Sequence, residues 1–195
     1  NAGTSLTINS VKDMFFDEIS AGSSKLTTLT VNGSDKVVID DILNTAVLAT
    51  VEITGADNVD LGKIADADKL ATLSVTSTSG SVTTDQIGDN AATSTDPENI
   101  AITLSAGTTV TAGIIEADIM GDVTITGGDG AVQVDELTSA AGGGIFTITA
   151  TKGAINLGDG TDGIITADTT GITVDMSATT FISDDGTDVG DDAIV

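Results

Sequence analysis

An internal repeat of 22 residues constrains the fold of this chain more than any other feature. The segment Lys25–Val31 returns as Val47–Ile53 and again as Lys69–Val75. Apolar residues alternate with polar or small ones in each copy, and this period of two is typical of a β-strand. A turn rich in Gly, Asn, Asp or Ser follows, and a second apolar alternation begins at Val37 in the first of these units. Each unit therefore holds two short strands.

The same pattern extends along most of the chain and gives about eight units. Its further apolar positions are Leu6, Ile8, Met14, Phe16, Ile19, Ile102, Leu104, Val110, Ala112, Ile115, Val123, Ile125, Val132, Val134, Leu137, Phe146, Ile148, Ile155, Leu157, Ile165, Ile172 and Val174. A unit of this size cannot bury its apolar face alone, whereas stacked units pair in parallel about 4.8 Å apart. The sequence predicts an all-β parallel β-solenoid, or β-helix, of about eight coils.

A column of acidic residues follows the second strand of many units. The shared position is occupied by Asp17, Asp40, Asp85 and Asp135 in four units, and by Gly62, Gly113 and Gly158 in three others. Each Asp precedes an acidic or amide residue and then an apolar one, a good start for a helical turn. We therefore expect a short capped helical turn after the second strand.

The repeat also organises the chain into one segment. Residues 1–195 read as a single solenoid that belongs to a larger protein, because neither end shows the polar cap that a free-standing solenoid needs. Residues 88–99 contain the only proline and lengthen the step from Leu73 to Ile102 to 29 residues. They are interpreted as a loop inserted into one coil, or alternatively as a boundary between two solenoids. Residues 184–195 are a fading repeat or a linker.

Composition narrows the functional classes. Thirty acidic residues against six Lys give a net charge of −24, while 39% hydrophobic residues indicate a folded chain rather than a disordered one. Without basic patches or aromatic platforms, we expect no nucleic acid partner. No apolar run reaches the roughly 20 residues of a membrane helix, so no membrane insertion is expected.

Catalytic chemistry is restricted by the residues that are missing. The chain has no Cys and no His, which excludes the common nucleophilic triads and thiolate or imidazole zinc sites. A carbohydrate-active β-helix could still use paired carboxylates, but the chain lacks Arg, Trp and Tyr to hold a sugar. We expect no enzyme activity and assign no catalytic residue.

Calcium is the cofactor that the residues favour, because Asp, Asn and backbone carbonyls supply hard oxygen ligands. The segment Leu157–Ile165 resembles the G-G-x-G-x-D-x-U-x nonapeptide of RTX calcium-binding β-rolls, with Leu157 in place of the first Gly. The candidate Ca²⁺ site consists of Gly158, Asp159, Gly160 and Asp162. The alternative is that these residues form only an acidic turn.

Outward positions of the first strand form a second column, rich in hydroxyl groups. Its members are Thr7, Asn9, Thr30, Asn32, Glu52, Thr54, Ser74, Thr76, Thr103, Ser105, Thr124, Thr126, Thr147 and Thr149. Thr ladders of this kind are typical of ice-binding proteins, although Thr is also simply a good strand former on a solvated face. Glu52 interrupts the ladder.

Together the units resemble the β-solenoid repeats of bacterial surface-layer proteins of the type I secreted, RTX-containing group, over residues 5–176. The resemblance lies in Thr-x-[Leu/Val]-x-[Val/Ile] strands, Gly/Asp turns, strong acidity and the partial nonapeptide. It implies an extracellular structural protein that self-associates with calcium into a lattice on the bacterial cell surface, with cell-surface polysaccharide as a further partner. Lys25–Val31 also looks like the strand of leucine-rich repeats in bacterial surface antigens, but the second half lacks their Ala-Phe step. The alternative function is the stalk of a secreted adhesin.

Overall fold

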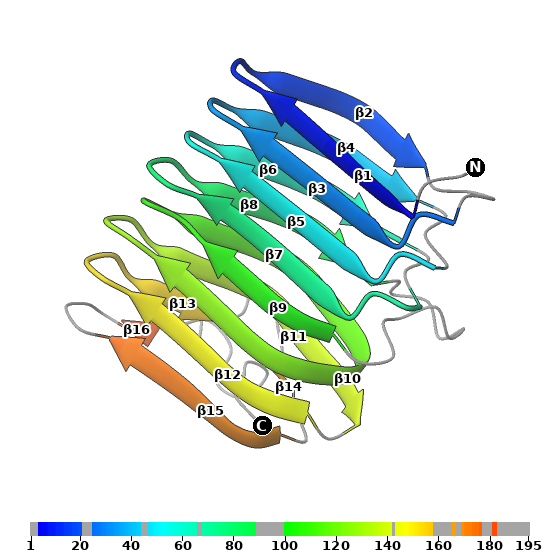
Figure 1. Ribbon diagram of the computed structural model, residues 1–195. Coiled ribbons are helices and arrows are strands. Elements are labelled where there is room, and N and C mark those ends of the chain that lie inside the picture. The colour runs from blue at the N-terminus through cyan, green and yellow to red at the C-terminus, as the bar shows by residue number, and fades with distance from the viewer. Residues whose placement is uncertain are drawn as a thin grey trace.

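The computed structural model describes residues 4–20, 25–43, 47–65, 68–88, 100–141, 143–157, 165–166, 169–176 and 181–182. These residues form an all-β parallel solenoid, which confirms the predicted fold class. Two sheets face each other across a shared interior and run the length of the stack (Figure 1).

Successive strands alternate between the two sheets. Sheet A stacks β1 (Ser5–Ser10), β3 (Thr28–Gly33), β5 (Thr50–Gly55), β7 (Thr72–Ser77), β9 (Ile100–Ser105), the second part of β10 (Val110–Gly127), β12 (Gly143–Ala150) and β15 (Thr169–Met176). Sheet B stacks β2 (Met14–Ser20), β4 (Val37–Leu43), β6 (Val59–Ile64), β8 (Val82–Ile87), the first part of β10, β11 (Val132–Ala141), β13 (Ile155–Leu157), β14 (Ile165–Thr166) and β16 (Phe181–Ile182). The described residues make about six turns, whereas the sequence predicted about eight coils, and the strand pairs β1–β2 and β15–β16 lie at the two ends of the described stack.

The repeat folds in this way because its apolar residues fall on one side of every strand. Leu29, Val51 and Leu73 are lateral partners in sheet A and are all fully buried. Val37 and Val59 hold the corresponding position in sheet B and meet the same core. Parallel pairing therefore extends each apolar column from coil to coil, and burial of these columns drives the stacking.

The register survives the two irregular places in the stack. Leu73 pairs with Ile102 across the longest step in the repeat, so the coil on each side of residues 89–99 keeps its place; those residues themselves lie outside the described ranges. The second irregularity is β10, which runs without a break from sheet B into sheet A and shifts register between Met120 and Val123. Its curvature around the side of the stack is visible in Figure 1.

The predicted helical turns are wrong. Asp17, Asp40, Asp85 and Asp135 lie inside strands β2, β4, β8 and β11, and the described residues contain no helix. Pairing continues past the Asp position, as in Ile19↔Ile42 and Ile42↔Ile64. The backbone groups that a helical turn would use are therefore engaged with neighbouring coils, and the apolar residue two positions on is held in the core.

Two glycines of the same column have a steric role. A Cβ at Gly62 would overlap the backbone carbonyl oxygen of Asp40 in the preceding coil, and a Cβ at Gly113 would overlap that of Asp85. Neither glycine has a positive φ, so close approach of two backbones, and not turn geometry, selects the residue. The alternation of Asp and Gly in the sequence thus reflects contact between coils.

Replacing Gly113 by Ala tests this contact. The added methyl group must displace the Asp85 carbonyl, and we expect the free energy of unfolding to fall by about 1–3 kcal/mol. Denaturant unfolding followed by circular dichroism measures the change, with Thr124→Ala on the exposed face of sheet A as the matched control, expected within about 0.5 kcal/mol of the parent. Equal stability of the two variants would show that the coils are not in close contact at Gly113.

Candidate functional site

The interior of the solenoid is almost entirely apolar. Among the described residues, only Ser77 and Thr84 are polar and buried. The Thr84 side chain lies in a core column between Leu61 and Ala112, and its hydroxyl has no hydrogen-bond partner. Ser77 is satisfied, because its hydroxyl donates to the Asp57 carbonyl and accepts from the Gly80 N–H. Groups available for binding therefore lie on the outer faces, the turns and the ends.

The predicted calcium site lies outside the described residues. Gly158, Asp159, Gly160 and Asp162 follow directly after Leu157, the last residue of β13. Within the described ranges, no group of three or more acidic side chains is gathered closely enough to hold a metal ion. The calcium assignment to residues 158–162 stays a prediction.

Carboxylate and amide side chains at two turns and at the register shift inside β10 serve coil stacking. Three of them accept the backbone N–H of a residue 23 positions later in the next coil: Asp13 from Lys36 at 3.3 Å, Asn58 from Ser81 at 2.9 Å and Asp122 from Ile145 at 3.0 Å. The side chain stands in for a backbone acceptor where the chain leaves regular pairing. The abundance of Asp and Asn in the turns therefore has a structural cause that needs no metal.

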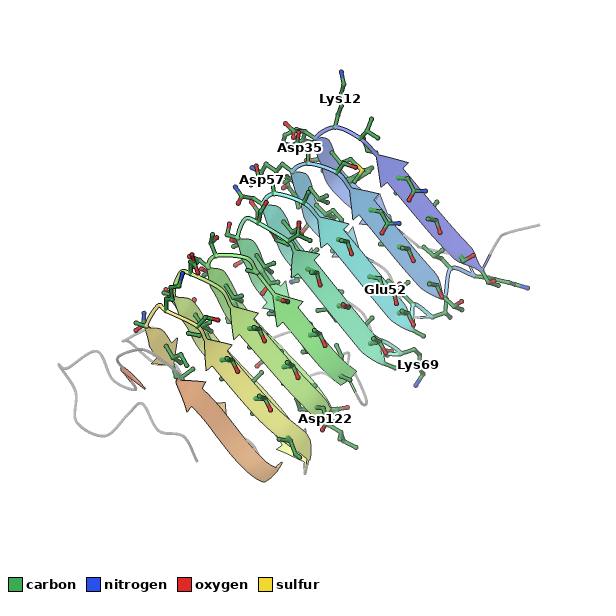
Figure 2. The ribbon with its side chains drawn as sticks, turned by 60° about the vertical axis from the view of Figure 1, so that its left-hand side comes forward. Lys12, Asp35, Glu52, Asp57, Lys69 and Asp122 are labelled. Carbon is green, nitrogen blue, oxygen red and sulfur yellow. The ribbon has the colours of Figure 1, made fainter. Side chains whose placement is uncertain are left out.

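A second set of turn residues carries charge at one equivalent position, two residues beyond the end of the sheet A strand. We call this set the turn column: Lys12, Asp35, Asp57, Asp129 and Lys152. Figure 2 shows Lys12, Asp35 and Asp57 along one edge of the stack. Lys152 Nζ lies 2.8 Å from the Asp129 carboxylate of the preceding coil, and both side chains are exposed. Such an exposed pair contributes at most about 1 kcal/mol, but it shows which coil a turn lysine contacts.

The predicted hydroxyl ladder lies on the outer face of sheet A. Register places Thr7, Thr30, Glu52, Ser74, Thr103, Thr124 and Thr147 in one column, and Asn9, Asn32, Thr54, Thr76, Ser105, Thr126 and Thr149 in the next. Neighbouring members are separated by about 4.8 Å between coils and about 6.6 Å along a strand. Glu52 interrupts the ladder, as the sequence indicated, and is exposed on this face (Figure 2).

The N-terminal end of the stack exposes apolar side chains. Leu6 is 40% exposed, whereas its partner Leu29 is fully buried. Ile8, Phe16 and Ile19 hold core positions but are only partly buried. A hollow lined by Asn9, Ser10, Val11, Asn32, Gly33 and Ser34 adjoins the first turn.

Two exposed apolar residues at this end were not singled out from the sequence. Val11 is 82% exposed and Phe15 is 66% exposed, with the Lys36 ammonium 5.9 Å from the Phe15 ring centre. A signal for Phe15 was present: it occupies an outward position that the next coil fills with Val38 and the two following coils fill with Asp60 and Thr83. An apolar residue at an outward position of the alternating pattern indicates a candidate contact surface.

Known proteins offer no further guide to the site. No family model matches the chain, and neither do curated proteins or solved structures. A search of the described residues for a helix long and apolar enough to cross a membrane finds none.

Substitution of Thr84 tests whether its buried hydroxyl, which has no hydrogen-bond partner, lowers the stability of the fold. Thr84→Val removes an unsatisfied polar group and keeps the side-chain shape, so the free energy of unfolding is expected to rise by about 1 kcal/mol. Thr83→Val, on the adjacent outward position, is the control and should change stability by no more than about 0.5 kcal/mol. A loss of stability in Thr84→Val would mean that the hydroxyl has a partner in solution.

Proposed function

We propose that the chain is a structural segment of a bacterial surface layer, a stiff acidic rod that self-associates outside the cell with calcium. The observation that carries the proposal is the uniform stack: each coil adds one strand to each of the same two sheets. A stack built in this way lengthens without changing its cross-section, so its faces present repeating contacts to neighbouring molecules.

The distribution of charge supports the same proposal. The core is apolar, so the charged side chains of the described coils lie on the outside or at the turns. The net charge of −24 makes close approach of two such rods unfavourable unless cations neutralise the carboxylates. Calcium bound at Asp159 and Asp162 would supply this neutralisation, in keeping with the resemblance to RTX-containing surface-layer proteins.

Calcium dependence is tested by thermal unfolding and electron microscopy of the 195-residue chain. Millimolar calcium should raise the melting temperature by several degrees, because a ligand at about 100 times its Kd contributes about 2.7 kcal/mol. Electron microscopy should show two-dimensional lattices of the protein under the same conditions. The double variant Asp159→Asn/Asp162→Asn should lose both effects.

The control is Asp57→Asn, which removes one exposed turn carboxylate and should keep the calcium response. A calcium shift of only a degree or two in the parent, or an equal shift in the double variant, removes this site from the mechanism. A protein that stays monomeric in calcium and binds a surface ligand would favour the adhesin stalk over the surface layer.

A second candidate, ice binding, is favoured by one observation, the two registered hydroxyl columns on sheet A. Their repeat of about 4.8 Å along the stack is close to an oxygen repeat of hexagonal ice. The face is nevertheless interrupted by Glu52 and by exposed Ala101.

Ice growth in the presence of the protein decides this candidate. Inhibition of ice recrystallisation that is lost in Thr103→Tyr and kept in Thr83→Tyr, on sheet B, would support an ice-binding face. Growth rates equal to those in a matched albumin solution would rule it out.

A further inference from the structure

We propose that the outer face of sheet A, from β3 to β12, is the contact surface for a second copy of this chain, with the two rods antiparallel. The inference deepens the self-association proposed above by naming the contact, and it rests on that proposal for its biological setting. Its physical grounds are the charge, the hydrogen-bonding groups and the area of this face.

The outer face of sheet A carries little charge, although the chain has a net charge of −24. Among the described members of the two hydroxyl columns, only Glu52 is charged (Figure 2). The outer face of sheet B is different, because exposed carboxylates stand on its neighbouring strands β4, β6 and β8: Asp40, Asp60 and Asp85. Two such acidic rods therefore approach each other at the lowest electrostatic cost through sheet A.

Hydroxyl groups make the face of sheet A complementary to itself. A Thr or Ser hydroxyl donates one hydrogen bond and also accepts, whereas an ionised carboxylate only accepts. Two copies of the sheet A face can thus satisfy each other, while two copies of the sheet B face would set acceptors against acceptors. Contact between identical patches is the geometry of a two-fold dimer, the commonest symmetry of soluble oligomers. Thr side chains are also stiff about χ1, so little rotamer freedom is lost on contact.

The face is large enough for a specific contact. The strands β3, β5, β7, β9, β10 and β12 lie side by side, and a strand such as β3 has 6 residues. At about 4.8 Å between strands and about 3.3 Å per residue, the face covers about 600 Å². Two copies would bury about 1,200 Å² in total, which is the lower end of the range for specific interfaces. We therefore expect a reversible dimer.

Glu52 selects the orientation of the two rods. In a parallel pair the two-fold axis follows the stack and sets both Glu52 carboxylates at the same level of the contact. In an antiparallel pair the axis follows the strands, and complete overlap from β3 to β12 places β5 opposite β10. Glu52 then faces Thr124 of the second copy, and the two Glu52 residues lie about three coil spacings, or about 14 Å, apart. This separation exceeds the Debye length of about 8 Å at physiological ionic strength.

Sedimentation velocity of the 195-residue chain in buffer with a calcium chelator tests the contact. The mean mass should rise with protein concentration and level off at twice 19.3 kDa, because a two-fold contact closes on itself. Raising sodium chloride from about 0.1 M to about 1 M shortens the Debye length from about 10 Å to about 3 Å. Association should become stronger over this range, since the repulsion between the acidic rods is screened.

Charge variants of Thr124 test the orientation. Thr124→Lys should strengthen dimerisation about threefold or more, because the two-fold axis makes the new lysine meet Glu52 twice. This gain should disappear when Glu52→Gln is added. Thr124→Glu should weaken dimerisation about tenfold or more. The matched control is Thr83→Lys on the outer face of sheet B, which changes the net charge as Thr124→Lys does and should associate like the parent.

Circular dichroism and the unfolding midpoint establish that each variant is folded. A parent that stays monomeric at every concentration and salt overturns the inference, as does unchanged association of Thr124→Glu. Equal gains from Thr124→Lys and Thr83→Lys also overturn it, because net charge alone would then explain the effect. A monomeric parent whose inhibition of ice growth is lost in Thr124→Glu would assign the face to ice instead.

The dimer contact and the surface-layer function fail separately. Calcium-dependent lattices formed by Thr124→Glu as well as by the parent would retain the surface-layer function and remove this contact. Calcium-free dimers of the parent, without lattices in calcium, would retain the contact and remove the surface-layer function.

Discussion

Parallel backbone pairing between coils is the interaction on which the rest of this structure depends. Pairing fixes each residue above its counterpart in the next coil, so Leu29, Val51 and Leu73 are forced into one buried column. It also brings backbones so close at Gly62 and Gly113 that a side chain has no room. Where regular pairing is interrupted, at two turns and at the register shift inside β10, Asp13, Asn58 and Asp122 accept a backbone N–H of the next coil. The apolar columns, the need for glycine at two positions and the side-chain hydrogen bonds between coils all follow from this parallel pairing.

This constraint explains which parts of the fold can be predicted from sequence. The 22-residue spacing and the alternation around Leu29 and Val31 are sufficient for the solenoid, because a two-strand unit has no other way to bury its apolar face. The helical turns failed because N-capping preference is a local property, whereas the backbone at Asp40 is held by pairing on either side of it. The role of Gly62 could not be read locally either, since its contact is with another coil. The calcium prediction at Asp159 and Asp162 concerns residues beyond the described ranges and is unchanged.

The polar and charged side chains of the described coils are spread over the surface and are not gathered at one site. The charged side chains of the described coils lie outside an apolar core, and close acidic trios are absent from those coils. Thr, Ser, Asn and Asp recur at fixed intervals, so any partner meets the same groups many times with modest strength at each contact. Binding by such a surface gains from repetition, as in multivalent association, more than from a single well-formed pocket. The structural role proposed above would use such repeated contacts.

The continuous strand β10 has a mechanical consequence. In other coils the sheet B strand and the following sheet A strand are separate elements, so one can peel away before the other. Residues 110–127 form a single strand that pairs in both sheets, and the pull that loosens its first part acts directly on its second. Stretched from its ends, the solenoid would unzip coil by coil until the fracture reached β10, where two ladders must break together. We expect unzipping to slow at β10, because the two parts of this one strand pair in different sheets.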